Sequence, residues 1–367
     1  MGFNCGIVGL PNVGKSTLFN ALTSTMAAQA ANYPFCTIEP NVGRVAVPDS
    51  RLEILSELAK SQKTIYTQLE FVDIAGLVRG ASKGEGLGNQ FLANIREVDA
   101  IVHVLRCFEN NDITHVEGTI DPVRDAETIE TELMLADLDS LERRIVPIEK
   151  KAKSGEKDAK VQMSVMEPVL NALREGKPAR LITFDDEERQ KIYKQLFLLT
   201  AKPILYVCNV DEGSAATGNA FSDKVFERAK KEGNQAVIIS AEIESEVARL
   251  TDPEEQKEFL ETLGLQETGL NRVIQAGYRL LDLMTFFTVG PKESRAWTIK
   301  KGMCAPQAAG VIHSDFEKGF IRAEIISYED FVECKSEARA RELGKLRSEG
   351  KTYEMQDGDI CHFLFNV

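Results

Sequence analysis

Residues 6–22 read GIVGLPNVGKSTLFNAL. The centre of this stretch, Gly9–Ser16, matches the phosphate-binding loop pattern GxxxxGK[ST]. A β-branched run precedes the loop, and a helical pattern from Thr17 to Leu22 follows it. Backbone N–H groups in such a loop curl around phosphate oxygens, which requires glycines where side chains would collide. The strand, loop and helix together predict a nucleotide-binding loop in an α/β domain.

Two side chains of the loop and two later segments of the chain are expected to bind phosphate and Mg²⁺. Lys15 is expected to reach the β- and γ-phosphates, and the Ser16 hydroxyl to ligate Mg²⁺. Asp73 ends a later strand in a DxxG arrangement, where the carboxylate can hold Mg²⁺ through water and the Gly76 amide can sense a γ-phosphate. Thr37 lies between the first helix and the second strand, where its hydroxyl would complete the metal shell. This constellation predicts a Mg²⁺-dependent nucleotide switch.

More β-branched runs alternate with helical patterns along the chain. Several of them are apolar without alternation, which is typical of strands covered on both faces. They predict a doubly wound, mostly parallel sheet. The runs expected to form strands after the first are Arg44–Val47, Leu69–Val72, Ala100–Leu105, Ile204–Val207 and Val237–Ile239.

The strand signals vanish from Asp125 to about Lys202, where charge-rich helical periodicity takes over. A break at Lys153-Ser154-Gly155 predicts an antiparallel helical hairpin inserted into the α/β domain. From Leu281 onward, strand-like segments separated by turn formers return, with a helix expected between Ser336 and Glu349. The predicted parts are a nucleotide domain (residues 1–124 and 203–280), the hairpin (125–202) and a small α+β domain (281–367).

Composition limits the classes of partner. The chain has 367 residues, 43% of them apolar and 28% charged, with a net charge of -13. Nonspecific DNA binding depends on an excess of Lys and Arg that displaces counterions, and this chain has an excess of acidic residues, so no nonspecific DNA binding is expected. No apolar run is long enough to span a membrane, so we expect a cytoplasmic protein without membrane contact. Residues 281–367 carry 12 Lys and Arg against 14 Asp and Glu, so this nearly neutral domain remains able to touch RNA locally.

The base-recognition segment departs from the guanine pattern Asn-Lys-x-Asp. Its place holds Asn209-Val210-Asp211-Glu212. Val210 has no lysine stem to lay over the base, and Glu212 carries its carboxylate one methylene further out than aspartate. Asn209 could instead read the ring nitrogen and amine of adenine. Guanine preference is therefore expected to be weak, with Ser240-Ala241-Glu242 placed to close over the base.

With these motifs, the chain resembles the Obg-like ATPase (YchF) family of translation-factor-type P-loop proteins. The resemblance implies a preference for ATP over GTP, slow Mg²⁺-dependent hydrolysis and association with ribosomes. It also implies that the C-terminal part is a TGS domain with a β-grasp-like fold. The segments that carry the resemblance are Gly9–Ser16, Asn32–Pro40, Asp73–Leu92, Asn209–Glu212 and Asp315–Glu324.

The resemblance also implies roles for individual residues. The P-loop asparagine Asn12 matches one that helps to ligate K⁺ in potassium-stimulated relatives; a backbone-capping asparagine is the alternative. The residues expected to hold the phosphates are Asn12, Val13, Gly14, Lys15, Ser16 and Thr17, with Gly76 near the γ-phosphate. Those expected on Mg²⁺ are Ser16, Thr37 and Asp73, and those expected around adenine are Asn209, Val210 and Glu212.

Hydrolysis needs a group that positions water, and the usual glutamine is missing. The residue directly after DxxG is Leu77, which can neither donate nor accept a hydrogen bond. His115 follows the end of a predicted strand, at the sheet edge where ligands bind. We expect His115 to orient or activate the water and Lys15 to stabilise the transferred phosphoryl group. The alternatives are a solvated loop histidine and, for transition-state charge, Arg79.

Three functions agree with these observations. The leading one is a nucleotide-switched ATPase on the ribosome, touching it through the hairpin or the C-terminal domain, and we expect a monomer. A GTPase of the same fold is the first alternative. A non-hydrolysing module that binds RNA or protein when it holds an adenine nucleotide is the second, because Leu77 cannot position water.

Overall fold

The computed structural model describes residues 3–30, 41–74, 87–110, 112, 115, 118–250 and 252–366. The chain divides into two compact units, each described by itself below. Unit 1 comprises Met1–Arg44 and Glu70–Gly277, and unit 2 comprises Val45–Leu69 and Tyr278–Val367. None of the helices in the described part of the chain is long and apolar enough to cross a membrane.

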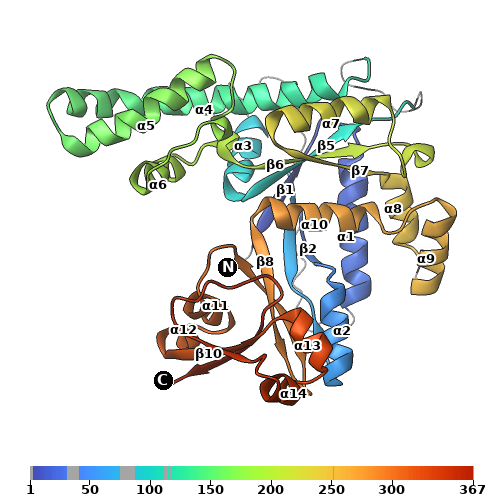
Figure 1. Ribbon diagram of the computed structural model, residues 1–367. Coiled ribbons are helices and arrows are strands. Elements are labelled where there is room, and N and C mark those ends of the chain that lie inside the picture. Colours follow the sequence, from blue (N-terminus) through green and yellow to red (C-terminus); the bar gives the residue numbers. More distant parts are fainter. Residues whose placement is uncertain are drawn as a thin grey trace. The chain divides into compact units, whose positions relative to one another are not determined.

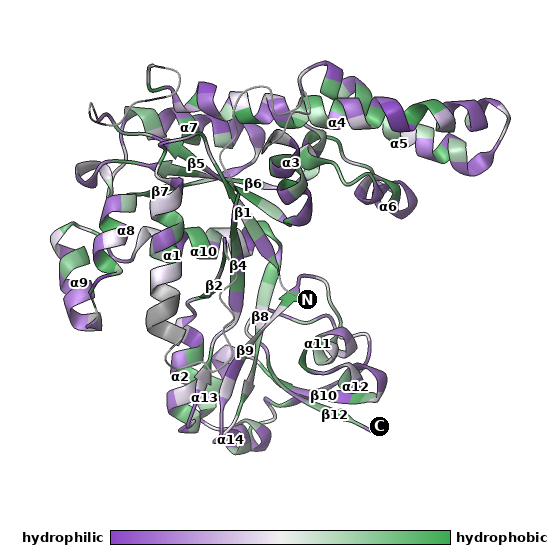
Figure 2. Cartoon of the chain, turned by 180° about the vertical axis from the view of Figure 1, so that it is seen from behind, coloured by the Kyte–Doolittle hydropathy of each residue, from purple (hydrophilic) through white to green (hydrophobic). Residues whose placement is uncertain are grey.

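Unit 1 is built on a sheet with the strand order β2-β4-β1-β5-β6-β7. The pairs β1–β4, β1–β5, β5–β6 and β6–β7 are all parallel, and all seven residues of β5 are buried. Figure 2 shows the central strands β1 and β6 as mainly hydrophobic. The predicted α/β fold and its six strands are therefore confirmed. Their bounds are β1 (Asn4–Val8), β2 (Val42–Ala46), β4 (Gln68–Asp73), β5 (Ala100–Arg106), β6 (Ile204–Asn209) and β7 (Gln235–Ile239).

The strand order reverses at β1, which is the point where open α/β sheets bind ligands. The P-loop follows β1 there. Helix α1 packs on α8, and α7 packs on β6 and β7. The helices begin and end at α1 (Lys15–Ala30), α3 (Leu87–Glu97), α4 (Pro122–Lys153), α5 (Lys157–Arg174), α6 (Glu187–Gln195), α7 (Ala220–Glu232), α8 (Ala241–Val247), α9 (Pro253–Thr262) and α10 (Gly269–Leu280). The short 3-10 turns are η2 (Ala179–Leu181), η3 (Leu199–Ala201) and η4 (Glu212–Ser214).

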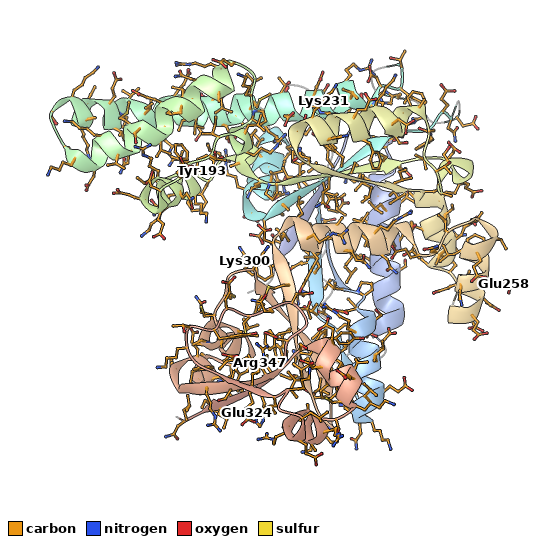
Figure 3. The ribbon with its side chains drawn as sticks, viewed as in Figure 1. Tyr193, Lys231, Glu258, Lys300, Glu324 and Arg347 are labelled. Atoms are coloured by element: carbon orange, nitrogen blue, oxygen red, sulfur yellow. The ribbon has the colours of Figure 1, made fainter. Side chains whose placement is uncertain are left out.

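Helices α4 and α5 form the helical hairpin (Figure 1). Its helical part begins earlier than predicted, at Pro122, because Asp121 caps α4 by accepting a hydrogen bond from the Arg124 N–H. Leu141 and Val165 belong to the apolar core between the two helices. The hydroxyl of Tyr193, labelled in Figure 3, donates to the Ala179 carbonyl at 2.7 Å and ties α6 to this core.

Unit 2 is a second six-stranded sheet, with the order β11-β10-β12-β8-β9-β3. Its first C-terminal strand, β8, lies parallel to its last, β12, as a β-grasp-like fold requires. The strand bounds are β3 (Thr64–Ile65), β8 (Leu283–Val289), β9 (Ser294–Lys300), β10 (Phe320–Ile326), β11 (Arg347–Glu349) and β12 (Ile360–Phe365). The helices are α2 (Ser50–Ala59), α11 (Ala305–Ile312), α12 (Ser314–Lys318), α13 (Tyr328–Cys334) and α14 (Glu337–Glu342).

Two expectations about this unit differ from the structure. Residues 45–69 belong to unit 2, although the sequence placed them in the nucleotide domain. The reason is tertiary: Leu52 and Leu55 of α2 share a buried core with Phe287, and β3 pairs with β9. The expected helix from Ser336 to Glu349 ends at Glu342, because residues 347–349 pair with β10 as strand β11.

A buried histidine in β5 makes the stability of unit 1 depend on pH. His103 is 3% exposed, and its ring lies beside Tyr206 with 5.9 Å between centroids. Burial, and then the charges of Arg228 and Arg180, lower the pKa of His103 to about 3 from 6.5. The unfolded chain therefore binds a proton below pH 6.5 that the folded chain does not, so stability is lost as the pH falls from 6.5 towards 3.

Between pH 7.5 and pH 5 this histidine should cost the wild type about 2 kcal/mol of unfolding free energy. The variant His103→Phe keeps a flat ring without a titrating group and should lose less stability, by that amount, over the same interval. Urea unfolding at both pH values measures the difference. Equal losses in the two proteins would contradict the prediction.

Candidate nucleotide-binding site

The loop after β1 has the backbone that a phosphate cradle requires. Asn12 has φ 62° and Gly14 has φ 92°, both in the left-handed region. A Cβ atom on Gly14 would lie 2.2 Å from the Asn209 Nδ2 atom, and one on Gly9 would lie 2.8 Å from the Val104 carbonyl oxygen. Only glycine fits at these two positions, because the backbone passes so close to its neighbours. This geometry agrees with the predicted phosphate-binding loop.

Asn209 at the end of β6 connects the loop to the start of α8. Its Nδ2 donates to the Val13 carbonyl at 3.0 Å, and its Oδ1 accepts from the Ala241 N–H at 2.9 Å. Asn209 is 4% exposed. A second N–H and a second lone pair remain on the amide, so its contact with adenine stays a prediction. Its two contacts within the protein hold the P-loop against the start of α8.

The rest of the base segment is arranged around the same strand end. The Val210 N–H donates to the Ile239 carbonyl at 2.8 Å, so a backbone contact from Val210 to adenine would use its carbonyl oxygen. Asp211 caps η4 by accepting from the Ser214 N–H at 3.1 Å. Glu212 is exposed at the start of η4. Of these side chains, Glu212 is therefore the one best placed to meet a ligand.

Lys15 and Asp73 come from different motifs and meet in the structure. The Lys15 Nζ forms an ion pair with Asp73 Oδ1, and both side chains are largely buried. Ser16 and Thr17 are exposed in the first turn of α1, where helix N–H groups and the helix dipole favour phosphate. A carboxylate and a hydroxyl are the oxygen ligands that Mg²⁺ prefers, and they lie here beside a cation suited to phosphate. The donor set therefore fits Mg²⁺ and a nucleotide phosphate. The predicted Thr37 and Gly76 lie outside the described residues, as do Leu77 and Arg79.

His115 is placed differently from a solvated loop histidine. Its residue is 8% exposed, and its Nε2 lies 2.8 Å from Oδ2 of Asp125, which is 1% exposed. Burial raises the pKa of Asp125, and the nearby His115 and Arg124 oppose that rise. Sequence reasoning missed Asp125 because an acidic residue in a first helical turn is common. The structure thus pairs the candidate water-positioning residue with a carboxylate from α4.

The chain is similar to known family models, to curated proteins and to a solved structure. A family model described as a 50S ribosome-binding GTPase matches residues 4–151, and the YchF-GTPase C-terminal model, described as a protein of unknown function (DUF933), matches residues 283–366. The chain is 60% identical to the Ribosome-binding ATPase YchF of Pasteurella multocida (strain Pm70) and 55% identical to that of Bacillus subtilis (strain 168), with 100% of both chains covered in each case. The solved YchF GTPase of Schizosaccharomyces pombe is similar with a TM-score of 0.89 and 38% identity, covering 99% of this chain and 98% of that chain. The chain therefore belongs to the YchF family.

Proposed function

We propose that this chain is a ribosome-associated nucleotide switch that binds ATP with Mg²⁺ and slowly hydrolyses it, and that takes GTP less well. The observation that carries the proposal is the glycine-shaped P-loop with Lys15 and Asp73 in contact beside it. Relatives named ribosome-binding ATPases match the chain over its full length. A protein that acts on ribosomes would be located in the cytoplasm.

Each site residue has a proposed task. Lys15 would bind the phosphates together with Ser16 and Thr17 in the first turn of α1. Ser16 and Asp73 would also hold Mg²⁺. Bound Mg²⁺ supplies charge neutralisation on the phosphate oxygens. His115 would orient the attacking water, since Leu77 cannot. Thr37, Gly76 and a K⁺ ion at Asn12 remain part of the proposal from sequence alone.

The C-terminal unit offers a basic patch for a local ribosomal contact. Two of its arginines form ion pairs within the unit: Arg341 with Glu324 at 2.9 Å and Arg347 with Glu349 at 3.5 Å. The charges of these two arginines are therefore largely neutralised. Lys300 and Lys301 at the end of β9 are exposed, and Figure 3 shows Lys300 on this unit. We propose that this pair touches ribosomal RNA, and that the hairpin is the second candidate contact.

Two experiments on the full chain test the nucleotide preference and the ribosome contact. Titration calorimetry at fixed Mg²⁺ should give tighter binding of ATP than of GTP; tighter GTP binding would favour the GTPase alternative. Co-sedimentation with ribosomes should differ between ATP, ADP and a non-hydrolysable ATP analogue. The same result with all three would argue against a switch.

Charge-reversal variants then distinguish the two contact surfaces. Lys300→Glu with Lys301→Glu should weaken sedimentation if the C-terminal unit makes the contact. Lys150→Glu with Lys151→Glu, both in the last turn of α4, should weaken it if the hairpin does. Full chains are needed, because deletion from Leu281 would remove most of the core in which α2 is buried.

A further inference from the structure

Phe197, between α6 and η3, combines two features that do not favour folding. It is 74% exposed, which is the largest value among the exposed large hydrophobic residues of the described chain. Its φ angle is 51°, in the left-handed region that favours glycine. Single apolar residues are common on protein surfaces, but a bulky residue in this backbone conformation is an outlier. The two features together point to a role in binding rather than in stability.

The residues around Phe197 fix this conformation. Leu196 and Leu198, one on each side of it, are buried in the hairpin core. The Arg144 Nη1 donates to the Leu196 carbonyl at 2.7 Å, and the Phe197 N–H donates to the Lys194 carbonyl at 3.3 Å. Phe197 therefore occupies the position just after the end of α6, where glycine is the usual residue. Because both leucines are held in the core, the phenylalanine ring is left on the surface.

The ring borders a shallow hollow on the exposed side of α6. The volume of the hollow is about 420 Å³, within the range of about 300–1,000 Å³ typical of small-ligand sites. Figure 1 shows α6 alongside α5 of the hairpin. The hollow offers an aromatic face, two amide groups and two cations. The residues that line it, all of them exposed, are Glu187, Gln190, Lys191, Lys194, Gln195 and Phe197.

The charges beside the ring are of the kind that attracts a polyanion. Lys191 and Lys194 lie about one helical turn apart, and neither forms an ion pair within the described residues. Glu187, the acid among the lining residues, lies about two helical turns before Lys194. Positive charge is therefore concentrated at the end of α6 that leads into Phe197.

An exposed ring with cations beside it is typical of sites for single-stranded nucleic acid. A base of any identity can stack on the ring, and lysines contact the flanking phosphates. Side-chain amides such as those of Gln190 and Gln195 can both donate to and accept from the edge of a base. A protein partner would instead need an apolar pocket for the ring, and the lysines would add little to that contact.

We propose that Phe197, Lys191 and Lys194 bind an unpaired base of ribosomal RNA, with the base stacked on the ring and its flanking phosphates on the two lysines. This inference rests on the proposed function, in which the protein associates with ribosomes. It names a contact chemistry for the hairpin, which is the second candidate surface for that association.

The test measures the affinity of full-length variants for purified ribosomes by co-sedimentation, with the nucleotide that gives the wild type its tightest binding. Phe197→Gly should weaken binding by about 10- to 100-fold, because the stack on one base is lost. Phe197→Tyr keeps a ring and should bind as the wild type does. Phe197→Leu keeps an apolar side chain without a ring and should bind as weakly as Phe197→Gly. The control is Phe226→Ala, which removes an exposed ring from α7 and should leave binding unchanged.

Two further measurements separate RNA contact from loss of folding. Lys191→Gln with Lys194→Gln should lower the slope of log affinity against log salt concentration by about 1 to 2, since two phosphate contacts are lost. Phe197→Gly should resist urea at least as well as the wild type, because glycine suits the left-handed backbone. ATP hydrolysis without ribosomes should be unchanged in every variant.

Several outcomes would overturn the proposal. If Phe197→Gly binds ribosomes as the wild type does, the ring makes no contact, although the proposed ribosome association survives. If the wild type binds ribosomes with no nucleotide, that association fails and this site fails with it. Binding kept by Phe197→Leu and lost by Phe197→Tyr, with an unchanged salt slope in the lysine variant, would assign the ring to an apolar pocket of a ribosomal protein. Unfolding of Phe197→Gly at a lower urea concentration than the wild type would show that the ring stabilises the fold instead.

Discussion

Replacement of Lys15 by alanine should lower single-turnover ATP hydrolysis by about 100- to 1000-fold. Lys15 follows Gly14 directly, and its Nζ contacts Asp73, so the ammonium group lies beside the residues proposed to bind Mg²⁺ and phosphate. Charge on the transferred phosphoryl group would lose its fixed cation in the variant. Rapid-quench assays with excess enzyme measure the chemical step apart from product release.

The control for this prediction is a lysine outside the site. Lys257 in α9 has a side chain that is 79% exposed, and Lys257→Ala should hydrolyse ATP as the wild type does. Circular dichroism of both variants shows whether they fold. A folded Lys15→Ala variant with the wild-type rate would contradict the assignment of the P-loop as the hydrolytic site.

The second large effect concerns stability, at Asp137 in the hairpin. This carboxylate is 2% exposed and accepts three hydrogen bonds: from the Leu199 N–H at 2.8 Å, the Thr200 N–H at 2.8 Å and the Thr200 hydroxyl at 2.7 Å. It thereby ties α4 to η3, where the chain returns to β6. Asp137→Ala would leave these donors buried without their acceptor and should lower the unfolding free energy by about 3–5 kcal/mol.

Urea unfolding at neutral pH measures this loss. The matched variant is Asp139→Ala, two residues further along α4, where the side chain is 64% exposed and pairs with Arg143 on the same helix. It should change stability by no more than about 0.5 kcal/mol. Similar losses in the two variants would mean that the buried bonds of Asp137 do not stabilise the hairpin root.

Much of unit 1 could be predicted from sequence because the relevant signals are local. The apolar run Ala100–Leu105 predicts a buried strand without any knowledge of its neighbours, and β5 is that strand. The break at Lys153-Ser154-Gly155 likewise predicts the turn between α4 and α5. Residues 45–69 were misassigned because their helix and strands look the same whichever core they join. Leu52 and Leu55 are apolar in either case, and only contact with Phe287 shows where they pack.

Some features of the candidate site could likewise be predicted from local sequence, and others could not. The α/β class, the P-loop and its lysine could be predicted from sequence, because glycine spacing and hydrophobic periodicity are patterns of neighbouring residues. That Asn209 donates to the carbonyl of Val13, 196 positions away, can be seen only in the folded chain. The tertiary structure also decided that His115 is buried against Asp125. Hydrogen bonds between side chains depend on where the sheet and helices bring distant residues, and no local pattern carries that information.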